Sequence, residues 1–170
     1  MRSEYAPRGE VEHILAALQP QNRLACEISL FTGLRINDVL ALKTSQIQKG
    51  RFTVKEEKTG KTRSVYLLKD LQARALAGAG QHFVFEGRLN GKKHRTRQAV
   101  FKDLRRAADL FRLRSHLTPH SMRKIYAVEE YKKHGNLKRV QRLLNHNDEA
   151  VTILYALADR LNKRKKYEIS

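Results

Sequence analysis

Cysteine is nearly absent from this chain: the only one among its 170 residues is Cys26, in the apolar segment LACEISLF. A single thiol cannot form a disulfide within the chain, and it cannot build a zinc site from several cysteines. A small secreted domain held together by disulfides is therefore excluded. The composition suits a reducing compartment, and we expect a cytoplasmic protein.

Long apolar segments are also missing. No run approaches the ~20 residues of a membrane-spanning helix, and the N-terminal residues MRSEYAPRGEVEH lack the apolar stretch of a signal peptide. No low-complexity linker, internal repeat or long proline- or glycine-rich segment divides the chain. We therefore expect a single domain over residues 1–170, without a membrane-spanning segment.

Acidic residues are scarce relative to basic ones. Asp and Glu total 17 against 35 Lys and Arg, which gives a formal net charge of +18. The densest basic segment, residues 87–117, holds ten Lys and Arg against Asp103 and Asp109. Because such a charge attracts polyanions, nucleic acid is the favoured partner, ahead of an anionic membrane surface.

Apolar spacing and turn signals predict a mainly α fold with a small antiparallel β-sheet. Helices are expected at residues 9–18, 22–31, 36–42, 71–77, 97–113, 119–133, 137–144 and 148–164. Pro20 is expected to stop the first helix, and Gly33 to cap the second in a left-handed conformation. The segments RFTVKEE and TRSVYLL, joined by KTGK, predict a β-hairpin, and HFVF at residues 82–85 predicts a further short strand.

The segment TPHSMRK places His120 and Arg123 on one face of a helix that Thr118 and Pro119 are expected to begin. Free N–H groups and the helix dipole at such a start favour an anion such as phosphate. For this pattern alone, an ordinary polar helix start is the better explanation. His116 and His120 have the spacing of a metal pair, but Pro119 interrupts a helix joining them and no third ligand is evident, so we expect no metal.

Arg35 follows the Gly33 helix stop in TGLRINDVLAL, and Asp38 lies three residues later. An arginine oriented by a carboxylate can be purely structural, which is the better explanation in isolation. It can also be a rigid bidentate clamp for phosphate oxygens.

The hairpin turn KTGK carries two ammonium groups, those of Lys58 and Lys61. For either lysine alone, a solvated turn residue is the better explanation.

In LLNHNDEAVTILY, His146 is expected in a loop, and Tyr155 lies nine residues later on the last predicted helix. Apolar neighbours make a core tyrosine the better explanation in isolation. The functional alternative is attack on phosphate by the phenol, whose ordinary pKa is ~10. That attack would need cations and hydrogen-bond donors close by.

Together and in this order, the motifs resemble the tyrosine recombinase (phage integrase) family. The resemblance covers nearly the whole chain, from about residue 11 to about residue 161. It implies the fold of the family's catalytic domain. It also implies a site-specific DNA recombinase or integrase of a phage or mobile element, which cleaves and rejoins strands through a 3′-phosphotyrosyl intermediate. Neither a metal nor another cofactor is expected.

The resemblance also implies roles for the cationic residues. Arg35 and Arg123 would clamp the scissile phosphate, and Asp38 would support Arg35. Lys58 would be the general acid for the leaving 5′-hydroxyl. The basic residues expected to contact the DNA are Lys61, Arg88, Lys92, Lys93, Arg95 and Arg97.

In the same comparison, Tyr155 would be the nucleophile, His120 would assist proton transfer, and His146 would be a second histidine donor. The departures from the family pattern are small. Asn145 stands where members often have glycine, and Lys124 replaces a frequent histidine. Neither change removes a catalytic group.

Most family members carry a helical core-binding domain before the catalytic domain, and we expect none in this chain. It is either an excised catalytic domain or a naturally short member, similar in layout to the fimbrial phase-switch invertases. Residues from about 160 to 170 would form a basic C-terminal tail. By resemblance, the partner is double-stranded DNA rather than a membrane, and the protein would be a monomer in solution and a homo-tetramer on DNA.

Two alternatives stay open. A type IB topoisomerase-like enzyme would use the same chemistry to nick and close DNA without strand exchange. A catalytically silent, basic DNA-binding regulator would keep only the fold.

Overall fold

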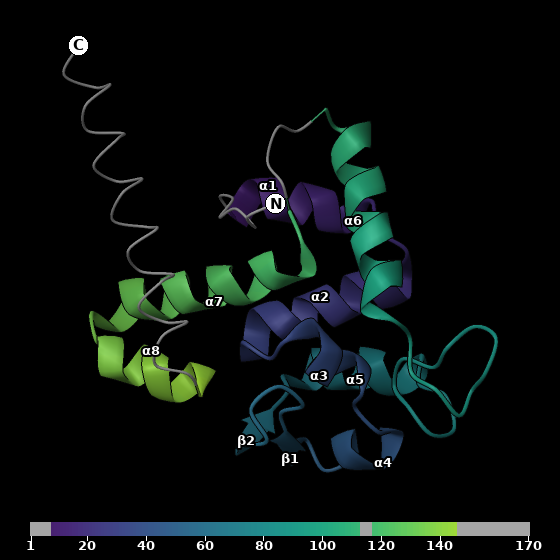
Figure 1. The fold of residues 1–170 in the computed structure, drawn as a ribbon, viewed down its shortest axis with the longest axis horizontal. Coiled ribbons are helices and arrows are strands. Elements are labelled where there is room, and N and C mark those ends of the chain that lie inside the picture. The colour runs from purple at the N-terminus through teal and green to yellow at the C-terminus, as the bar shows by residue number, and fades with distance from the viewer. Residues whose placement is uncertain (1–7, 113–116, 146–170) are drawn as a thin grey trace.

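The computed structural model describes residues 8–112 and 117–145 (Figure 1). These residues form eight helices and one β-hairpin. The helices are α1 (Arg8–Ala16), α2 (Pro20–Thr32), α3 (Ile36–Leu40), α4 (Thr44–Ile47), α5 (Lys69–Ala77), α6 (Arg97–Leu110), α7 (Pro119–His134) and α8 (Leu137–Leu144). The strands are β1 (Arg51–Lys55) and β2 (Thr62–Tyr66). The mainly α fold with a small antiparallel sheet is confirmed.

Helix α2 is the centre of this arrangement, packing against α7, α3, α5 and α6. The hairpin, α3, α4 and α5 gather at one end of the molecule, while α1 and α6 lie at the other (Figure 1). One apolar core joins most of these elements, and a smaller cluster of Ala127, Val128, Val140 and Leu144 fixes α8 on α7. Every helix in the described part of the chain is too short or too polar to cross a lipid bilayer.

The two ends of α2 show how local chemistry places the next loop. Pro20 does not merely stop the preceding helix: it is the first residue of α2, where its missing N–H costs nothing. Gly33 caps the other end with φ 68°, and its N–H donates to the Ser29 carbonyl at 2.8 Å. A side chain at Gly33 would also collide with the Tyr126 ring, because its Cβ would lie 2.4 Å from Cδ1. The left-handed cap predicted for Gly33 is therefore confirmed, and it turns the chain sharply toward Arg35.

The hairpin has the alternation that the sequence predicts. Phe52 and Val54 face the core, while their neighbours in β1 face outward. Val54 pairs with Arg63 across the antiparallel ladder. The turn over residues 56–61 is closed by the Glu56 N–H, which donates to the Lys61 carbonyl at 2.9 Å. This closure holds the lysine-bearing turn at a defined position beside α3.

Several predictions about which elements form, and where they end, were wrong. Residues 82–85 form no strand: the segment makes only single bridges, Lys43 with Phe83 and Glu86 with His94. Helix α4 was not predicted. Helix α6 ends at Leu110 rather than at residue 113, because the chain turns there and Arg112 has φ 50°. The helix predicted over residues 148–164 lies outside the described residues.

Candidate active site

Side chains from four distant segments line one cavity of about 470 Å³. Three of them were predicted as site residues with catalytic roles: Arg35 from the loop before α3, Lys58 from the hairpin turn and His120 from the start of α7. The other lining residues are Ile36, Asn37, Asp38, Glu57 and Arg97. An opening lined by several cationic side chains suits a phosphodiester, because each of them favours negative charge.

Arg35 has a carboxylate partner that the sequence did not predict. Its Nη1 donates to Oε2 of Glu56 at 2.6 Å, and the Glu56 side chain is 0% exposed. Asp38, expected to support Arg35, accepts the backbone N–H of Glu57 at 2.9 Å. The pKa of Asp38 is raised, chiefly by burial, while the charge of Arg35 acts to lower it. Glu56, the residue after β1, thus adds direct support of Arg35 to that expected from Asp38.

The two lysines of the hairpin turn occupy different surroundings. Lys58 is exposed and lines the cavity with Arg35 and His120. Lys61 does not line the cavity: its Nζ donates to the backbone carbonyl of Asn145 at 3.3 Å. Lys58, and not Lys61, therefore shares the cavity with Arg35 and His120.

His120 and Arg123 lie one turn apart at the start of α7, but they differ in burial. His120 is half-buried and lines the cavity. Arg123 is 0% exposed and is not among the lining residues. It donates to the carbonyl of Gly33 at 2.5 Å and to that of Leu144 at 2.6 Å. Arg123 thus ties the loop before Arg35 to the end of α8.

Thr118 is the N-cap residue of α7, as predicted, and it forms a capping box with Ser121. The hydroxyl of Ser121 accepts the N–H of Thr118 at 3.1 Å. Pro119 occupies the first helical position as predicted.

The predicted DNA-contacting residues of the loop before α6 fall into two groups. Arg88, Lys92 and Lys93 are exposed, and so is Arg97 at the first position of α6. Arg95 is half-buried: its Nε donates to Oδ1 of Asn22 at 2.7 Å and its Nη2 to Oε1 of Gln19 at 3.2 Å. Arg95 therefore anchors the loop to α2.

His146 and Tyr155 lie outside the described residues, as does His116. The described chain reaches Asn145, which ends α8 with φ 56° and lies beside Lys61. Within residues 8–112 and 117–145, no group of three or more His, Cys, Asp or Glu side chains could hold a metal ion.

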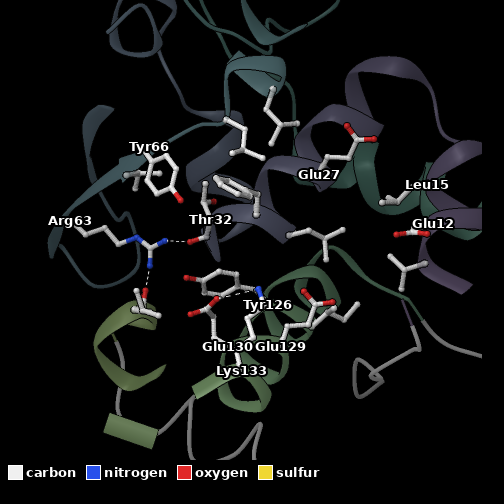
Figure 2. A pocket seen from close by; sticks show the side chains of 18 of the residues that line it. Glu12, Leu15, Glu27, Thr32, Arg63, Tyr66, Tyr126, Glu129, Glu130 and Lys133 are labelled. Carbon is white, nitrogen blue, oxygen red and sulfur yellow. Dashed lines mark hydrogen bonds and ion pairs between the residues drawn. The ribbon is translucent and has the colours of Figure 1, made fainter. Parts of the chain in front are cut away.

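A larger cavity of about 940 Å³ lies between α2, the hairpin and α7 (Figure 2). It contains none of the residues predicted as site residues. Apolar side chains share its lining with carboxylates and with basic side chains. The smaller cavity is the better candidate for the chemistry, because it gathers Arg35, Lys58 and His120.

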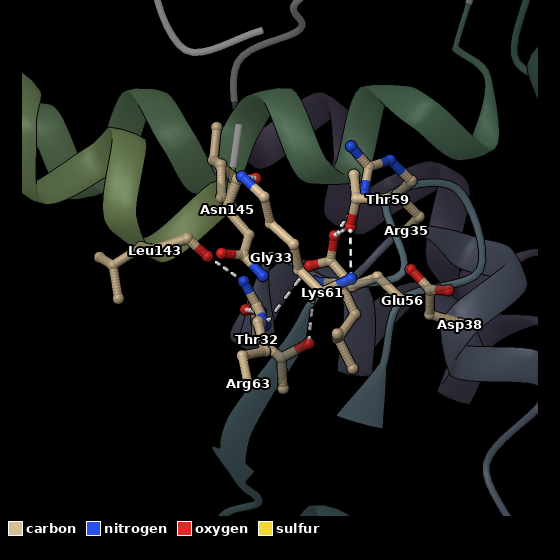
Figure 3. A network of polar contacts seen from close by, with 12 residues as sticks. Thr32, Gly33, Arg35, Asp38, Glu56, Thr59, Lys61, Arg63, Leu143 and Asn145 are labelled. Carbon is tan, nitrogen blue, oxygen red and sulfur yellow. Dashed lines mark hydrogen bonds and ion pairs between the residues drawn. The ribbon is translucent and has the colours of Figure 1, made fainter. Parts of the chain in front are cut away.

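Glu56 and Arg63, which the sequence did not single out, lie at the centre of a polar network (Figure 3). A signal for Glu56 was present. Phe52 and Val54 establish the inward positions of β1, and the next inward position two residues later is a glutamate. A charged residue on the buried side of a strand needs a cationic partner, and Arg35 supplies it.

Comparison with protein families matches residues 5–161 to the phage integrase family. A tyrosine recombinase of Thermosipho africanus is 27% identical over 170 residues, covering 89% of this chain and 56% of that protein. Tyrosine recombinase XerC of Xanthomonas campestris pv. campestris is 32% identical over 162 residues, covering 90% of this chain and 49% of that protein. The chain spans about half the length of these curated relatives.

Solved structures agree with the fold. A lambda integrase tetramer bound to a Holliday junction matches with a TM-score of 0.72 and 23% identity, over 90% of this chain and 48% of that chain. The expected catalytic-domain fold of the tyrosine recombinases is thereby confirmed. Since the family match extends over residues 5–161, the chain belongs to the phage integrase family.

Proposed function

We propose that this protein is a site-specific DNA recombinase that cleaves and rejoins strands through a 3′-phosphotyrosyl intermediate on Tyr155. The observation that carries the proposal is the convergence of Arg35, Lys58 and His120 on one cavity. These residues come from three segments far apart in the sequence, and each stands in the motif where the family has a catalytic group. Membership of the family makes strand cleavage the chemistry that best accounts for this convergence.

The cations would stabilise charge on the phosphate as Tyr155 attacks. Arg35 is held at the cavity by Glu56, so its guanidinium is oriented before DNA arrives. We assign Arg123 as the second clamp from its place in the family motif, one turn after His120 at the start of α7. Its hydrogen bonds to the carbonyls of Gly33 and Leu144 would fix the loop before Arg35 against the end of α8.

The reaction balances without a cofactor. The phenolic oxygen of Tyr155 forms a bond to phosphorus, and the bond from phosphorus to the 5′-oxygen breaks. Lys58 gives a proton to the departing 5′-oxygen, while His120 and His146 assist removal of the phenolic proton and donate to the phosphate oxygens. The released 5′-hydroxyl then attacks a partner strand's phosphotyrosine, so the energy of the phosphodiester bond is conserved.

Double-stranded DNA is the proposed substrate and partner. The net charge of +18 and the exposed basic side chains of Arg88, Lys92 and Lys93 support binding along the phosphate backbone. Exchange between two duplexes requires several active sites at once. We therefore propose a homo-tetramer on DNA, as the lambda integrase structure shows for that protein.

Covalent capture tests the proposal and recovers the target site in the same experiment. The chain is incubated with short duplexes that carry a randomised segment and a nick, so that a short cleaved fragment diffuses away and traps the intermediate. DNA that stays attached to protein in detergent is sequenced, and we expect one enriched core site for wild-type protein and none for Tyr155→Phe.

The same assay separates the alternatives. Capture without joining of two duplexes that carry the recovered site would favour a topoisomerase-like enzyme. DNA binding without any covalent capture would contradict strand cleavage and favour a silent regulator.

A further inference from the structure

One oxygen atom connects the arginine of the cavity to the lysine-bearing turn. Oε2 of Glu56 accepts two hydrogen bonds, one from Nη1 of Arg35 at 2.6 Å and one from the hydroxyl of Thr59 at 3.1 Å. Thr59 follows Lys58 directly in the hairpin turn. The position of the Arg35 guanidinium is therefore coupled to the position of the residue next to Lys58 (Figure 3).

The other carboxylate oxygen faces Arg63. Oε1 of Glu56 lies 3.8 Å from Nε of Arg63. Through its other nitrogens, Arg63 donates to the carbonyls of Thr32 and Leu143. The network thus joins the end of α2, the hairpin and the last turn of α8.

Burial makes this carboxylate effective. The side chain of Glu56 is 0% exposed, whereas those of Arg35 and Arg63 are 13% and 14% exposed. Away from water, a bond between opposite charges is strong and directional. An uncharged group at this place would weaken the bond that Glu56 makes to the Arg35 guanidinium.

From these contacts we infer that Glu56 is a positioning residue. It holds Arg35 and the turn that carries Lys58 at places from which both side chains can act on one scissile phosphate. The inference rests on the proposed function, because the phosphate is the group that both cations would meet. Glu56 is not expected to touch DNA or the reacting atoms. It acts through Arg35 and through Thr59.

The test compares Glu56→Gln with wild-type chain on a duplex recovered by covalent capture. Glutamine keeps the size of the side chain but loses its charge. We expect adduct formation to slow about tenfold or more on the ordinary phosphodiester. Glu56→Asp, which keeps the charge on a shorter side chain, should recover part of the rate.

Modified substrates distinguish positioning from general damage to the fold. A methylphosphonate at the scissile position lacks the charge that Arg35 neutralises, and sulfur at the bridging 5′ position leaves without the proton that Lys58 gives. The deficit of Glu56→Gln should therefore shrink on both substrates. A purely structural role would lower the rate on all three substrates by the same factor.

A matched control uses the same substitution elsewhere. Glu27 pairs with Arg23 at 2.7 Å and Arg74 at 2.5 Å, and it lies outside the cavity. Glu27→Gln should cleave the phosphodiester at the wild-type rate. If Glu56→Gln fails to fold, Thr59→Val removes the hydroxyl's bond to Glu56, together with the bond that it accepts from the Lys61 N–H, and its deficit should shrink on the sulfur substrate.

The outcomes separate the two proposals. A wild-type chain that forms no adduct contradicts the proposed function, and the inference falls with it. A wild-type adduct together with unimpaired Glu56→Gln contradicts the inference alone. A Glu56→Gln deficit of equal size on all three substrates also overturns it.

Discussion

Lys61 donates its Nζ to the Asn145 carbonyl at 3.3 Å, while Lys58, three residues earlier in the same turn, lines the cavity with Arg35. One turn thus carries two ammonium groups that face different neighbours. In the sequence, the two residues are of the same type and stand at nearly the same place. The structure separates them by what each side chain can reach.

Lys58→Ala should therefore slow cleavage of an ordinary phosphodiester by about a hundredfold or more, the usual effect of losing a general acid. A substrate with sulfur at the 5′-bridging position should largely restore the rate, because a thiolate leaves without a proton. The rate of adduct formation in a single turnover is measured on both substrates. Lys61→Ala should show no such rescue by sulfur, and the opposite pattern for the two lysines would refute the assignment.

Cleavage should persist in excess EDTA. In the proposed mechanism, positive charge at the phosphate comes from Arg35, Arg123 and the neighbouring cations, so no metal is required. The measurement is adduct formation after chelation. Loss of cleavage that added magnesium or zinc restores would contradict the metal-free mechanism.

The exposed basic loop should set the salt dependence of DNA binding. Replacing Arg88, Lys92 and Lys93 by alanine should reduce the slope of log K against log salt by about 0.9 for each lost phosphate contact. Arg95→Ala should instead lower the free energy of unfolding, because Arg95 donates to Asn22 and Gln19. Titrations at several salt concentrations and urea unfolding test the two effects. An unchanged slope in the triple variant would exclude this loop from the interface.

Asp103 should stabilise the fold in a pH-dependent way. Burial alone would raise its pKa, but hydrogen bonds from Asn22, Arg106 and the Gln19 N–H outweigh burial and hold the pKa below the ordinary value of 3.8. The contribution of the Asp103 carboxylate to the free energy of unfolding is therefore complete above the unfolded-state pKa. It is lost as the pH falls through the folded-state pKa. Asp103→Asn should lower the free energy of unfolding by about 2 kcal/mol at neutral pH.

Urea unfolding of wild type and Asp103→Asn at neutral and acidic pH checks this expectation. The difference between the two proteins should shrink as the pH falls below 3.8. A difference that stays constant down to strongly acidic pH would show that the charge of Asp103 contributes nothing.

Local signals in the sequence predicted the elements that carry the site. The Gly33 cap, the hairpin and the Pro119 helix start each depend on residues close together in the chain, so their chemistry can be read directly. Helix α8 has the predicted bounds, residues 137–144. Its position against α7 depends instead on contacts between separate segments.

The support of Arg35 could not be read from spacing alone. Asp38 has the right spacing on α3, and Glu56 also reaches Arg35 because the hairpin packs beside the α2–α3 loop. That contact spans 21 residues of sequence. Only the three-dimensional packing brings Glu56 to Arg35, although the inward position of Glu56 in the strand pattern was a usable signal.

The structure also narrows the choice of nucleophile. Tyr66, Tyr126 and Tyr131 are described, and none of them lines the cavity with Lys58. Tyr126 lies against Gly33 and lines the larger cavity. Burial raises its pKa, which makes its phenol a poorer source of phenolate. Tyr5, Tyr155 and Tyr167 lie outside the described residues, and the family motif is the ground on which Tyr155 is assigned as the nucleophile.

The most direct test is to find the residue that carries the DNA. Wild-type adduct captured on the recovered site is digested with nuclease and protease, and the nucleotide-bearing peptide is identified by mass spectrometry. We predict a nucleotide 3′-phosphate on Tyr155, and no adduct for a folded, DNA-binding Tyr155→Phe. A nucleotide on Tyr126 or Tyr167, or an undiminished adduct in Tyr155→Phe, would contradict the proposed mechanism.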